Sequence, residues 1–147
     1  MTPIDTGSRH VLTYGSLMYD AVWRSVVRGA YRSLPARAPG FRRFAVRNET
    51  YPAVLREAGQ QVIGCLYLDV AAQDLARLDD FEGTDYDRVS AQVWPLEVSG
   101  PAAAALSAEL YLYRDAERLE TRDWDPQWFE AEGIHLFMRR YRPTGSA

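Results

Sequence analysis

The chain has 147 residues, of which 47% are hydrophobic and 25% charged, a balance typical of a single globular domain. All 17 of its basic residues are arginine, and it has one cysteine and two histidines. These counts exclude a catalytic or phosphate-loop lysine, an internal disulfide and a three-histidine metal site within the chain. We expect one domain over 1–147, with its core at about 10–142, and neither a metal nor another cofactor.

The net charge of −3 conceals two halves of opposite sign. Residues 1–66 hold nine arginines against four acids, and residues 67–147 hold eight against sixteen. A basic half can indicate nucleic-acid binding. Here, however, Arg43 and Arg47 alternate with apolar residues, which predicts a strand with a solvated face, and the pI of about 5.4 opposes phosphate binding. We therefore expect no nucleic-acid partner.

No apolar run approaches the roughly 20 residues that a membrane helix needs. The polar start of the chain, Met1 to Arg9, lacks the apolar core of a secretory signal. Together with the single cysteine, these features favour a cytoplasmic protein without a membrane partner. The oligomeric state stays open between a monomer and a homodimer.

The first half of the chain predicts a strand, a helix and four further strands, at 10–14, 21–28, 31–37, 41–47, 53–57 and 61–70. Asp20 is expected to cap the helix and Gly29 to end it. Pro39-Gly40 and residues 58–60 are expected to interrupt the strand pairs. The run at 61–70 is the most apolar of the chain, so we expect it to be a central strand.

The second half predicts a helix, two strands and a last helix, at 72–81, 87–96, 109–114 and 126–141. Gly83 suits the C-cap of the first helix, and Asp125-Pro126 is a typical start of the last one. Its expected inward residues are Phe129, Gly133, Leu136 and Phe137. Strands outnumber helices and mostly follow one another directly, which indicates an α+β fold, a small mixed barrel-like sheet with flanking helices.

The first candidate site is the turn Tyr14-Gly15-Ser16-Leu17-Met18, which places a glycine directly after an apolar strand. Glycine permits positive φ angles, and successive backbone N–H groups in such a turn can converge on an anion. The segment lacks the glycine and lysine spacing of a phosphate loop, so no nucleotide is implied. On local grounds it is either a strand-ending turn or an anion-binding turn.

The second candidate is the acidic segment from Leu78 to Arg88. A run of charge indicates a solvated helix end, and four of its acids fit that interpretation: Asp79, Asp80, Asp85 and Asp87. Glu82 differs, because it lies between an apolar Phe81 and the capping Gly83 at the end of a helix. The negative end of the helix dipole and partial burial both raise a carboxyl pKa, which favours Glu82 as a general base.

Several short motifs of this chain, taken in order, resemble the gamma-glutamylcyclotransferase-like family, in the branch of gamma-glutamylamine cyclotransferases and plant avirulence-induced-gene-like proteins. They are Tyr14-Gly15-Ser16-Leu17, Tyr51-Pro52-Ala53, Val62-Ile63-Gly64 and Leu78-Asp79-Asp80-Phe81-Glu82-Gly83 with Tyr86 and Arg88. The resemblance covers about residues 10–114 and extends to the Trp124-Asp125 helix. The chain departs from the family pattern at Tyr19, where Asp or Pro is common.

The resemblance implies a mixed α/β fold around a small barrel. It also implies a pocket in which backbone amides of the Tyr14–Met18 turn hold a gamma-glutamyl group while Glu82 is the acid/base residue. The implied reaction is attack of the substrate's α-amine on its own side-chain amide, which yields 5-oxoproline and a free amine. Because the nucleophile belongs to the substrate, a chain without lysine and with one cysteine is adequate for it.

Other candidates are weaker. Cys65 and His135 could form a nucleophilic pair, but Cys65 lies in an apolar strand, where an inert core thiol is the more common outcome. Ser16 lacks the surroundings of a nucleophile elbow, and a core or subunit-contact role is expected for Trp124 and Trp128 rather than a pocket wall.

Two rival functions remain open: a non-catalytic member that binds a small carboxylate or a protein, and a hydrolase that pairs Glu82 with Asp79 or Asp85. For the cyclotransferase we expect Tyr86 to orient Glu82. We also expect Arg88 to pair with Asp80 or Asp85 rather than with Glu82, because a neighbouring guanidinium would lower the glutamate pKa. Loops near 115–124 are the expected source of the pocket for the leaving amine.

Overall fold

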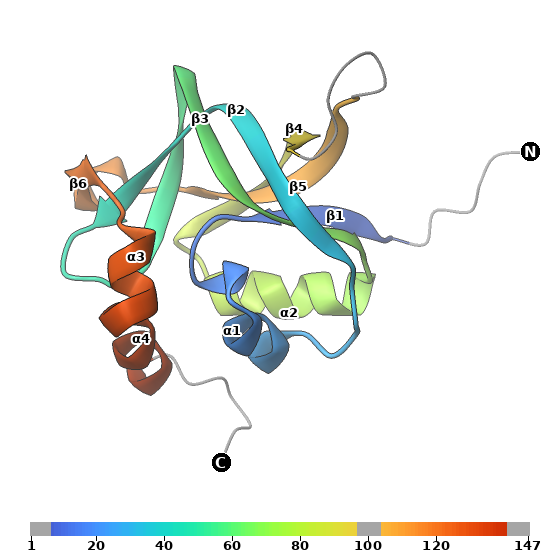
Figure 1. Ribbon diagram of the computed structural model, residues 1–147, viewed down its shortest axis with the longest axis horizontal. Coiled ribbons are helices and arrows are strands. Elements are labelled where there is room, and N and C mark those ends of the chain that lie inside the picture. Colours follow the sequence, from blue (N-terminus) through green and yellow to red (C-terminus); the bar gives the residue numbers. More distant parts are fainter. Residues whose placement is uncertain (1–6, 97–103, 141–147) are drawn as a thin grey trace, which may run out of the picture.

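The computed structural model describes residues 7–96 and 104–140 (Figure 1). Its strands are β1 (Arg9–Thr13), β2 (Ser33–Val46), β3 (Pro52–Val70), β4 (Tyr86–Pro95), β5 (Leu106–Tyr113) and β6 (Leu119–Asp123). Its helices are η1 (Ser16–Met18), α1 (Asp20–Val26), α2 (Ala72–Glu82), η3 (Ala116–Arg118), α3 (Pro126–Trp128), the π-helical η4 (Phe129–Gly133) and α4 (Ile134–Arg140). No helix within these residues has the length and apolarity to cross a membrane.

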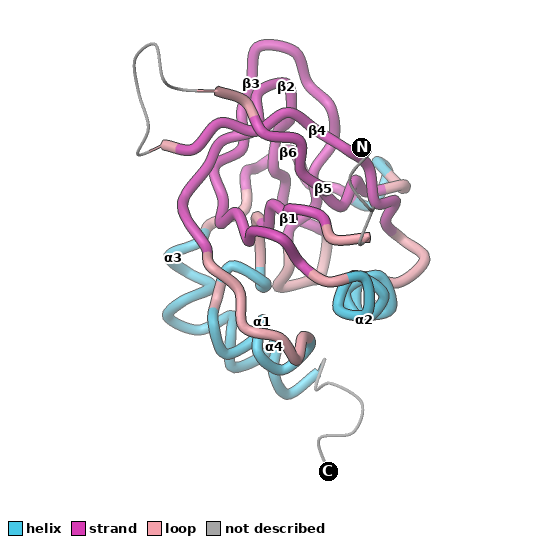
Figure 2. The backbone as a smooth tube through the Cα atoms, turned by 90° about the vertical axis from the view of Figure 1, so that its right-hand side faces the viewer, coloured by secondary structure: helices cyan, strands magenta, loops and turns pink. Residues whose placement is uncertain are grey.

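Five of the strands close into a barrel. They pair in the order β3-β1-β5-β4-β2, and β2 pairs again with β3, while β6 adds to the free edge of β2. β1 and β5 run parallel, and the other pairs are antiparallel. Helices α1, α2, α3 and α4 gather at one end of the barrel (Figure 2). The predicted α+β class with a small mixed barrel is confirmed.

Strand β1 lies between two hydrophobic cores, and neighbouring residues of the strand pack into opposite ones. Leu12 points into the barrel, where it packs with Leu66 and Leu110, and Val11 points to the helices, where it packs with Leu78. This alternation is the ordinary consequence of a strand that is covered on both faces. The end of β1 therefore reaches the boundary between barrel and helices, and the turn that follows it lies there.

The predicted interruptions of the long strands are wrong. β2 and β3 are each continuous, and they pair along most of their length. The register shifts between Pro39 and Phe41, opposite the protruding β3 segment that contains Gly59. Gly40 and Gly59 both have positive φ angles, of 87° and 83°, so the glycines shape a bulge within the hairpin rather than ending its strands.

The first helix also departs from its prediction. Tyr19 stands at the N-cap of α1 with no side-chain cap, and the helix ends at Val26, before Gly29. The backbone N–H groups of Arg28 and Gly29 donate instead to the Asp74 carboxylate of α2, at 3.0 and 2.9 Å. This long-range partner satisfies the N–H groups that a continued helix would have used, and it binds α1 to α2.

The last helix begins as predicted, with the Asp125 side chain accepting a hydrogen bond from the Gln127 N–H. Phe129 and Phe137 are buried, but Leu136 is 46% exposed, contrary to its prediction. The wider π-helical turn over Phe129–Gly133 takes up about one extra residue, so Phe137 rather than Leu136 returns to the face of Phe129. The predicted end at Tyr141 lies outside the described residues.

Candidate active site

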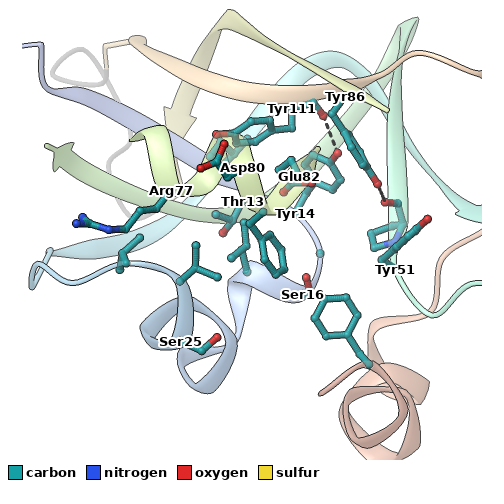
Figure 3. Close-up of a pocket in the computed structure, with 18 of the residues that line it drawn as sticks. Thr13, Tyr14, Ser16, Ser25, Tyr51, Arg77, Asp80, Glu82, Tyr86 and Tyr111 are labelled. Atoms are coloured by element: carbon teal, nitrogen blue, oxygen red, sulfur yellow. Dashed lines mark hydrogen bonds between the residues drawn. The ribbon is translucent and has the colours of Figure 1, made fainter. Parts of the chain in front are cut away.

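A cavity of about 830 Å³ lies between the end of β1, the turn after it, α1 and α2 (Figure 3). Six of the predicted site residues line it: Tyr14, Gly15, Ser16, Leu17, Glu82 and Tyr86. Met18 does not. Its N–H donates to the Gly15 carbonyl, and its side chain packs against the core on the helix side. The structure thus brings together two segments that lie almost 70 residues apart in the sequence.

Two glycines let other chain segments come close to the turn. A Cβ at Gly64 would overlap the Thr13 carbonyl oxygen, so this glycine permits β3 to cross the end of β1. A Cβ at Gly15 would lie 2.7 Å from the ring of Pro52. The φ of Gly15 is −137°, so this turn does not use the positive φ that glycine permits. Close packing against Pro52 is the reason for a glycine at this position.

The turn at Gly15–Leu17 has backbone N–H groups without hydrogen-bond acceptors. Among the described residues, the N–H groups of Gly15, Ser16 and Leu17 have no acceptor, and no side chain caps η1. Ser16 and Leu17 are also buried, at 7% and 4% exposure. Unpaired N–H groups are costly away from water, so a bound acceptor would be favourable here.

Arg43 of β2 fixes the orientation of this turn. Its Nη1 donates to the Tyr14 carbonyl at 2.7 Å, and its guanidinium lies 5.2 Å from the ring centroid of Trp124. The peptide bonds of the described residues are trans, so the Gly15 N–H points away from the Tyr14 carbonyl. Gly15 lines the cavity and Arg43 does not, so the arginine holds the turn from outside the cavity. The predicted solvated face at Arg43 is therefore wrong, because its charge is partly buried behind the turn.

Glu82 ends α2 and is partly buried in the cavity wall, with Gly83 at φ 77° as the C-cap that the sequence predicts. Burial, followed by the nearby Asp79 carboxylate, raises the pKa of Glu82 from 4.5 to about 8. No hydrogen bond or ion pair from the described residues opposes this rise. A carboxyl group with this pKa exchanges its proton near neutral pH.

A charged cluster behind Glu82 differs from its prediction. Arg88 does not contact Glu82, as expected, but its partners are Asp79 at 3.0 Å and Glu109 at 3.1 Å rather than Asp80 or Asp85. The Tyr111 hydroxyl also donates to Asp79, at 2.8 Å. Asp79 is therefore a bonded member of this cluster and not a solvated helix-end acid.

Tyr86 has a different hydrogen bond from the one expected. Its hydroxyl donates to the Pro52 carbonyl at 3.1 Å, so it holds the segment whose proline ring packs on Gly15. The Tyr14 hydroxyl donates to the Tyr111 carbonyl at 2.6 Å. Both tyrosines stand near Glu82 in Figure 3, and burial keeps the pKa of each hydroxyl well above its usual value, so both stay protonated.

The remaining candidates lie elsewhere. Cys65, His135, Trp124, Trp128 and residues 115–124 do not line this cavity. Trp124 is buried and donates to the Thr50 carbonyl, whereas Trp128 is 39% exposed. Asp85 lines the cavity but is exposed and pairs with Arg118. Within the described ranges, no three side chains of His, Cys, Asp or Glu gather as metal ligands.

The arrangement combines a proton-exchanging carboxyl group with backbone donors across one cavity. A substrate between them could lose a proton to Glu82 while the N–H groups of Gly15 to Leu17 stabilise a carboxylate or a developing oxyanion. The site has no protein nucleophile with an activating base among the lining residues. This chemistry suits a substrate that carries its own nucleophile.

Comparisons with known proteins agree with this geometry. A family model described as gamma-glutamyl cyclotransferase, AIG2-like, matches residues 11–126. AIG2-like protein D of Arabidopsis thaliana is 34% identical over 83 residues, which are 56% of this chain and 55% of that protein. Protein AIG2 C of the same plant is 24% identical over 142 residues, which are 97% of this chain and 84% of that protein.

The fold has solved relatives. The structure of a gamma-glutamyl cyclotransferase superimposes with a TM-score of 0.65 at 17% identity, over 91% of this chain and 80% of that one. At this identity the likeness concerns the fold alone. The match to AIG2-like protein D spans only about half of that protein's length.

Proposed function

The chain belongs to the AIG2-like gamma-glutamyl cyclotransferase family, and we propose that it converts a γ-glutamyl amide into 5-oxoproline and a free amine. Glu82 is the general acid and base of this reaction. The observation that carries the proposal is the partly buried Glu82 carboxyl group, with its raised pKa, in the same cavity as the unpaired N–H groups of the Gly15–Leu17 turn.

The reaction needs three proton transfers at the substrate, which one carboxyl group can make in turn, and no added nucleophile. Ionised Glu82 takes a proton from the α-ammonium group of the substrate. The freed amine attacks the γ-carbonyl carbon, a new C–N bond closes the five-membered ring, and negative charge develops on the carbonyl oxygen. Glu82 then returns the proton to the leaving nitrogen as the original amide C–N bond breaks. The carboxylate that this step regenerates takes the second proton from the ring nitrogen and passes it to the released amine or to solvent. No water is consumed.

The turn is suited to the charges of this substrate. Its N–H groups can hold either the α-carboxylate or the developing oxyanion, and the burial of Ser16 and Leu17 strengthens such hydrogen bonds. With a pKa of about 8, about a tenth of Glu82 is ionised at pH 7. We therefore expect kcat/KM to rise with pH until Glu82 is ionised.

Conversion of Glu82 to Gln tests the proposal, because the amide keeps the shape of the side chain and cannot take the proton. Purified protein is incubated with γ-glutamyl amines, γ-glutamyl amino acids and glutathione, and 5-oxoproline is quantified. The wild type should release 5-oxoproline from at least one of them, and Glu82→Gln should lower turnover by about two orders of magnitude or more. Turnover within threefold of the wild type would exclude Glu82 as the base.

Asp69→Asn is the control, since Asp69 is also an exposed acid but lies outside the cavity. It should retain activity within a few fold. If wild-type protein binds 5-oxoproline but converts none of the amides, the chain is instead a carboxylate-binding member of the family, the rival function named above.

A further inference from the structure

The cavity continues from Glu82 toward a basic end between α1 and α2. Arg24 and Arg28, at the end of α1 and just after it, line this part together with Arg77 of α2. In Figure 3, Arg77 and Tyr51 stand at opposite sides of the labelled group, with Tyr14 and Glu82 between them. Asp80 is the acid that accompanies these arginines among the lining residues.

The three guanidinium groups have charge available for a ligand. The Arg28 side chain has no ion-pair partner among the described residues. Arg24 contacts Asp20 at 3.5 Å, where both side chains are more than three-quarters exposed, which makes a weak pair. Arg77 donates through Nη1 to Asp74 at 2.6 Å, and its other N–H groups have no partner in the described part of the chain. Arg28 therefore offers an unpaired positive charge at this end of the cavity, and Arg24 and Arg77 add N–H donors.

The two ends of the cavity differ in how buried their lining residues are, and this difference indicates how a substrate would lie. The turn and Glu82 are buried or partly buried, whereas Arg24, Arg28 and Asp80 are exposed. Ring closure requires the γ-glutamyl half to be folded and shielded, so it belongs at the buried centre. The other half of the substrate then extends to the open end, where the arginines are.

We propose that Arg28, with Arg24 and Arg77, binds a carboxylate of the leaving amine, so that the preferred substrates are γ-glutamyl amino acids or peptides rather than amides of simple amines or diamines. This inference rests on the proposed function, because it assigns the γ-glutamyl half to the Glu82 side. A guanidinium group matches a carboxylate in charge and in geometry. A cationic leaving group would meet the unpaired charge of Arg28, beside two arginines whose ion-pair partners, Asp20 and Asp74, are already engaged.

Three ligands that differ only at the leaving amine test the charge preference. They are γ-glutamyl-alanine, γ-glutamyl-ethylamide, which is the same molecule without the carboxylate, and the γ-glutamyl monoamide of 1,4-diaminobutane, which carries a positive charge. Dissociation constants are measured by calorimetry at pH 7 in the Glu82→Gln background, which prevents turnover. We expect γ-glutamyl-alanine to bind about fivefold more tightly than the ethylamide, and the diamine derivative to bind most weakly.

Variants identify the arginine. Arg28→Gln in the same background should lower the preference for γ-glutamyl-alanine by about threefold, and Arg28→Glu should reverse it in favour of the diamine derivative. Arg32→Gln is the matched control, since it removes the same charge from an exposed residue outside the cavity and should leave the preference unchanged. The preference should also weaken with added salt.

Equal affinity for the three ligands overturns the inference, and so does tightest binding of the diamine derivative. If Arg28→Gln weakens all three ligands by the same factor, Arg28 holds the α-carboxylate that they share, which also overturns it. The proposed function is judged separately, by 5-oxoproline release from the same three compounds with wild-type protein. A carboxylate preference in binding without any release would support the inference and contradict the reaction.

Discussion

The two ends of α2 each place an acid in a partly or fully buried position, with opposite results. Asp74, in the first turn, accepts hydrogen bonds from the Arg28 and Gly29 N–H groups, the Tyr31 hydroxyl and Arg77, at 2.6–3.0 Å. Burial alone raises the pKa of Asp74, but the hydrogen bonds from Tyr31, Arg28 and Gly29 outweigh it and hold the pKa at about 2. Asp74 is thus a permanent charge.

Glu82, in the last turn of the same helix, has no such donors among the described residues. Burial and the Asp79 carboxylate raise its pKa to about 8. The comparison shows that burial does not determine the behaviour of a carboxyl group here. The number of hydrogen-bond donors aimed at it decides whether the group holds the fold together or exchanges a proton at neutral pH.

The largest expected effect is on stability, at the Asp74 end. Asp74→Asn leaves four donors facing a neutral amide, and we expect it to lower the free energy of unfolding by about 3 kcal/mol, as the loss of a buried charge partner does. Urea denaturation measures this change. Asp20→Asn, at an exposed acid of α1, should change stability by less than about 0.5 kcal/mol. A loss below about 1 kcal/mol for Asp74→Asn would show that these hydrogen bonds contribute little.

The Glu82 end should respond to pH in the opposite sense. The folded state holds the Glu82 proton up to about pH 8, whereas the unfolded chain releases it near pH 4.5. Stability from this residue is therefore complete below pH 4.5 and is lost as the pH rises through 8. Between pH 5 and pH 9, the wild type should therefore lose more free energy of unfolding than Glu82→Gln does. We expect the extra loss to be about 1–3 kcal/mol after allowance for solvent screening.

Thermal or urea unfolding of both proteins at the two pH values measures this difference. At low pH, Asp74 makes the free energy of unfolding depend on pH in the opposite direction. Its contribution is present above pH 3.8 and is lost as the pH falls toward 2. Parallel stability curves for wild type and Glu82→Gln between pH 5 and 9 would mean that the native Glu82 titrates normally.

Neighbouring charges should move the activity profile by a smaller amount. Asp79→Asn removes the carboxylate that raises the pKa of Glu82, so the acid limb of kcat/KM against pH should move to lower pH. Arg88→Gln leaves the Asp79 charge less compensated, so the limb should move to higher pH. Opposite shifts support this arrangement, whereas shifts of the same sign would indicate that the two variants act through a common structural disturbance.

The sequence was sufficient to predict the parts of this site that depend on local pattern. Glu82 stands out because an apolar residue precedes it and a capping glycine follows it, and the turn at Gly15 follows a clear strand. The α+β class follows from the density of strands. The start of the last helix is equally local, since Asp125-Pro126 supplies both its cap and its first residue.

Contacts between distant segments were beyond that reasoning. Asp74 ends α1 early from 45 residues away, and Arg43, expected in solvent, donates to Tyr14. Gly64 is required by a strand crossing that only the closed barrel creates. The exposure of Leu136 follows from a π-helical turn that periodicity does not reveal. The sequence shows only that a glycine or an arginine interrupts a strand pattern. It does not show which distant residue will contact it.

Arg43 provides the smallest and most specific of these tests, because it acts on the turn without lining the cavity. Arg43→Met keeps much of the packing of the aliphatic stem and removes the hydrogen bond to the Tyr14 carbonyl. The Gly15 N–H is then less polarised, and the turn is less firmly held. We expect 5-oxoproline to bind about tenfold more weakly, because the turn that donates to its carboxylate has lost a charged hydrogen-bond partner.

Arg43→Lys should recover part of the binding, since it keeps the charge and one donor. The backbone ¹⁵N resonance of Gly15 gives a second measurement, because it responds to hydrogen bonding at the preceding carbonyl. It should move in Arg43→Met and return partway in Arg43→Lys. Arg42→Met is the matched control, since that arginine pairs with Glu57 and Asp123 on the surface and should leave the Gly15 resonance in place. Unchanged binding together with an unmoved Gly15 resonance in Arg43→Met would show that the turn holds its shape without Arg43, and that packing of Pro52 on Gly15 is sufficient.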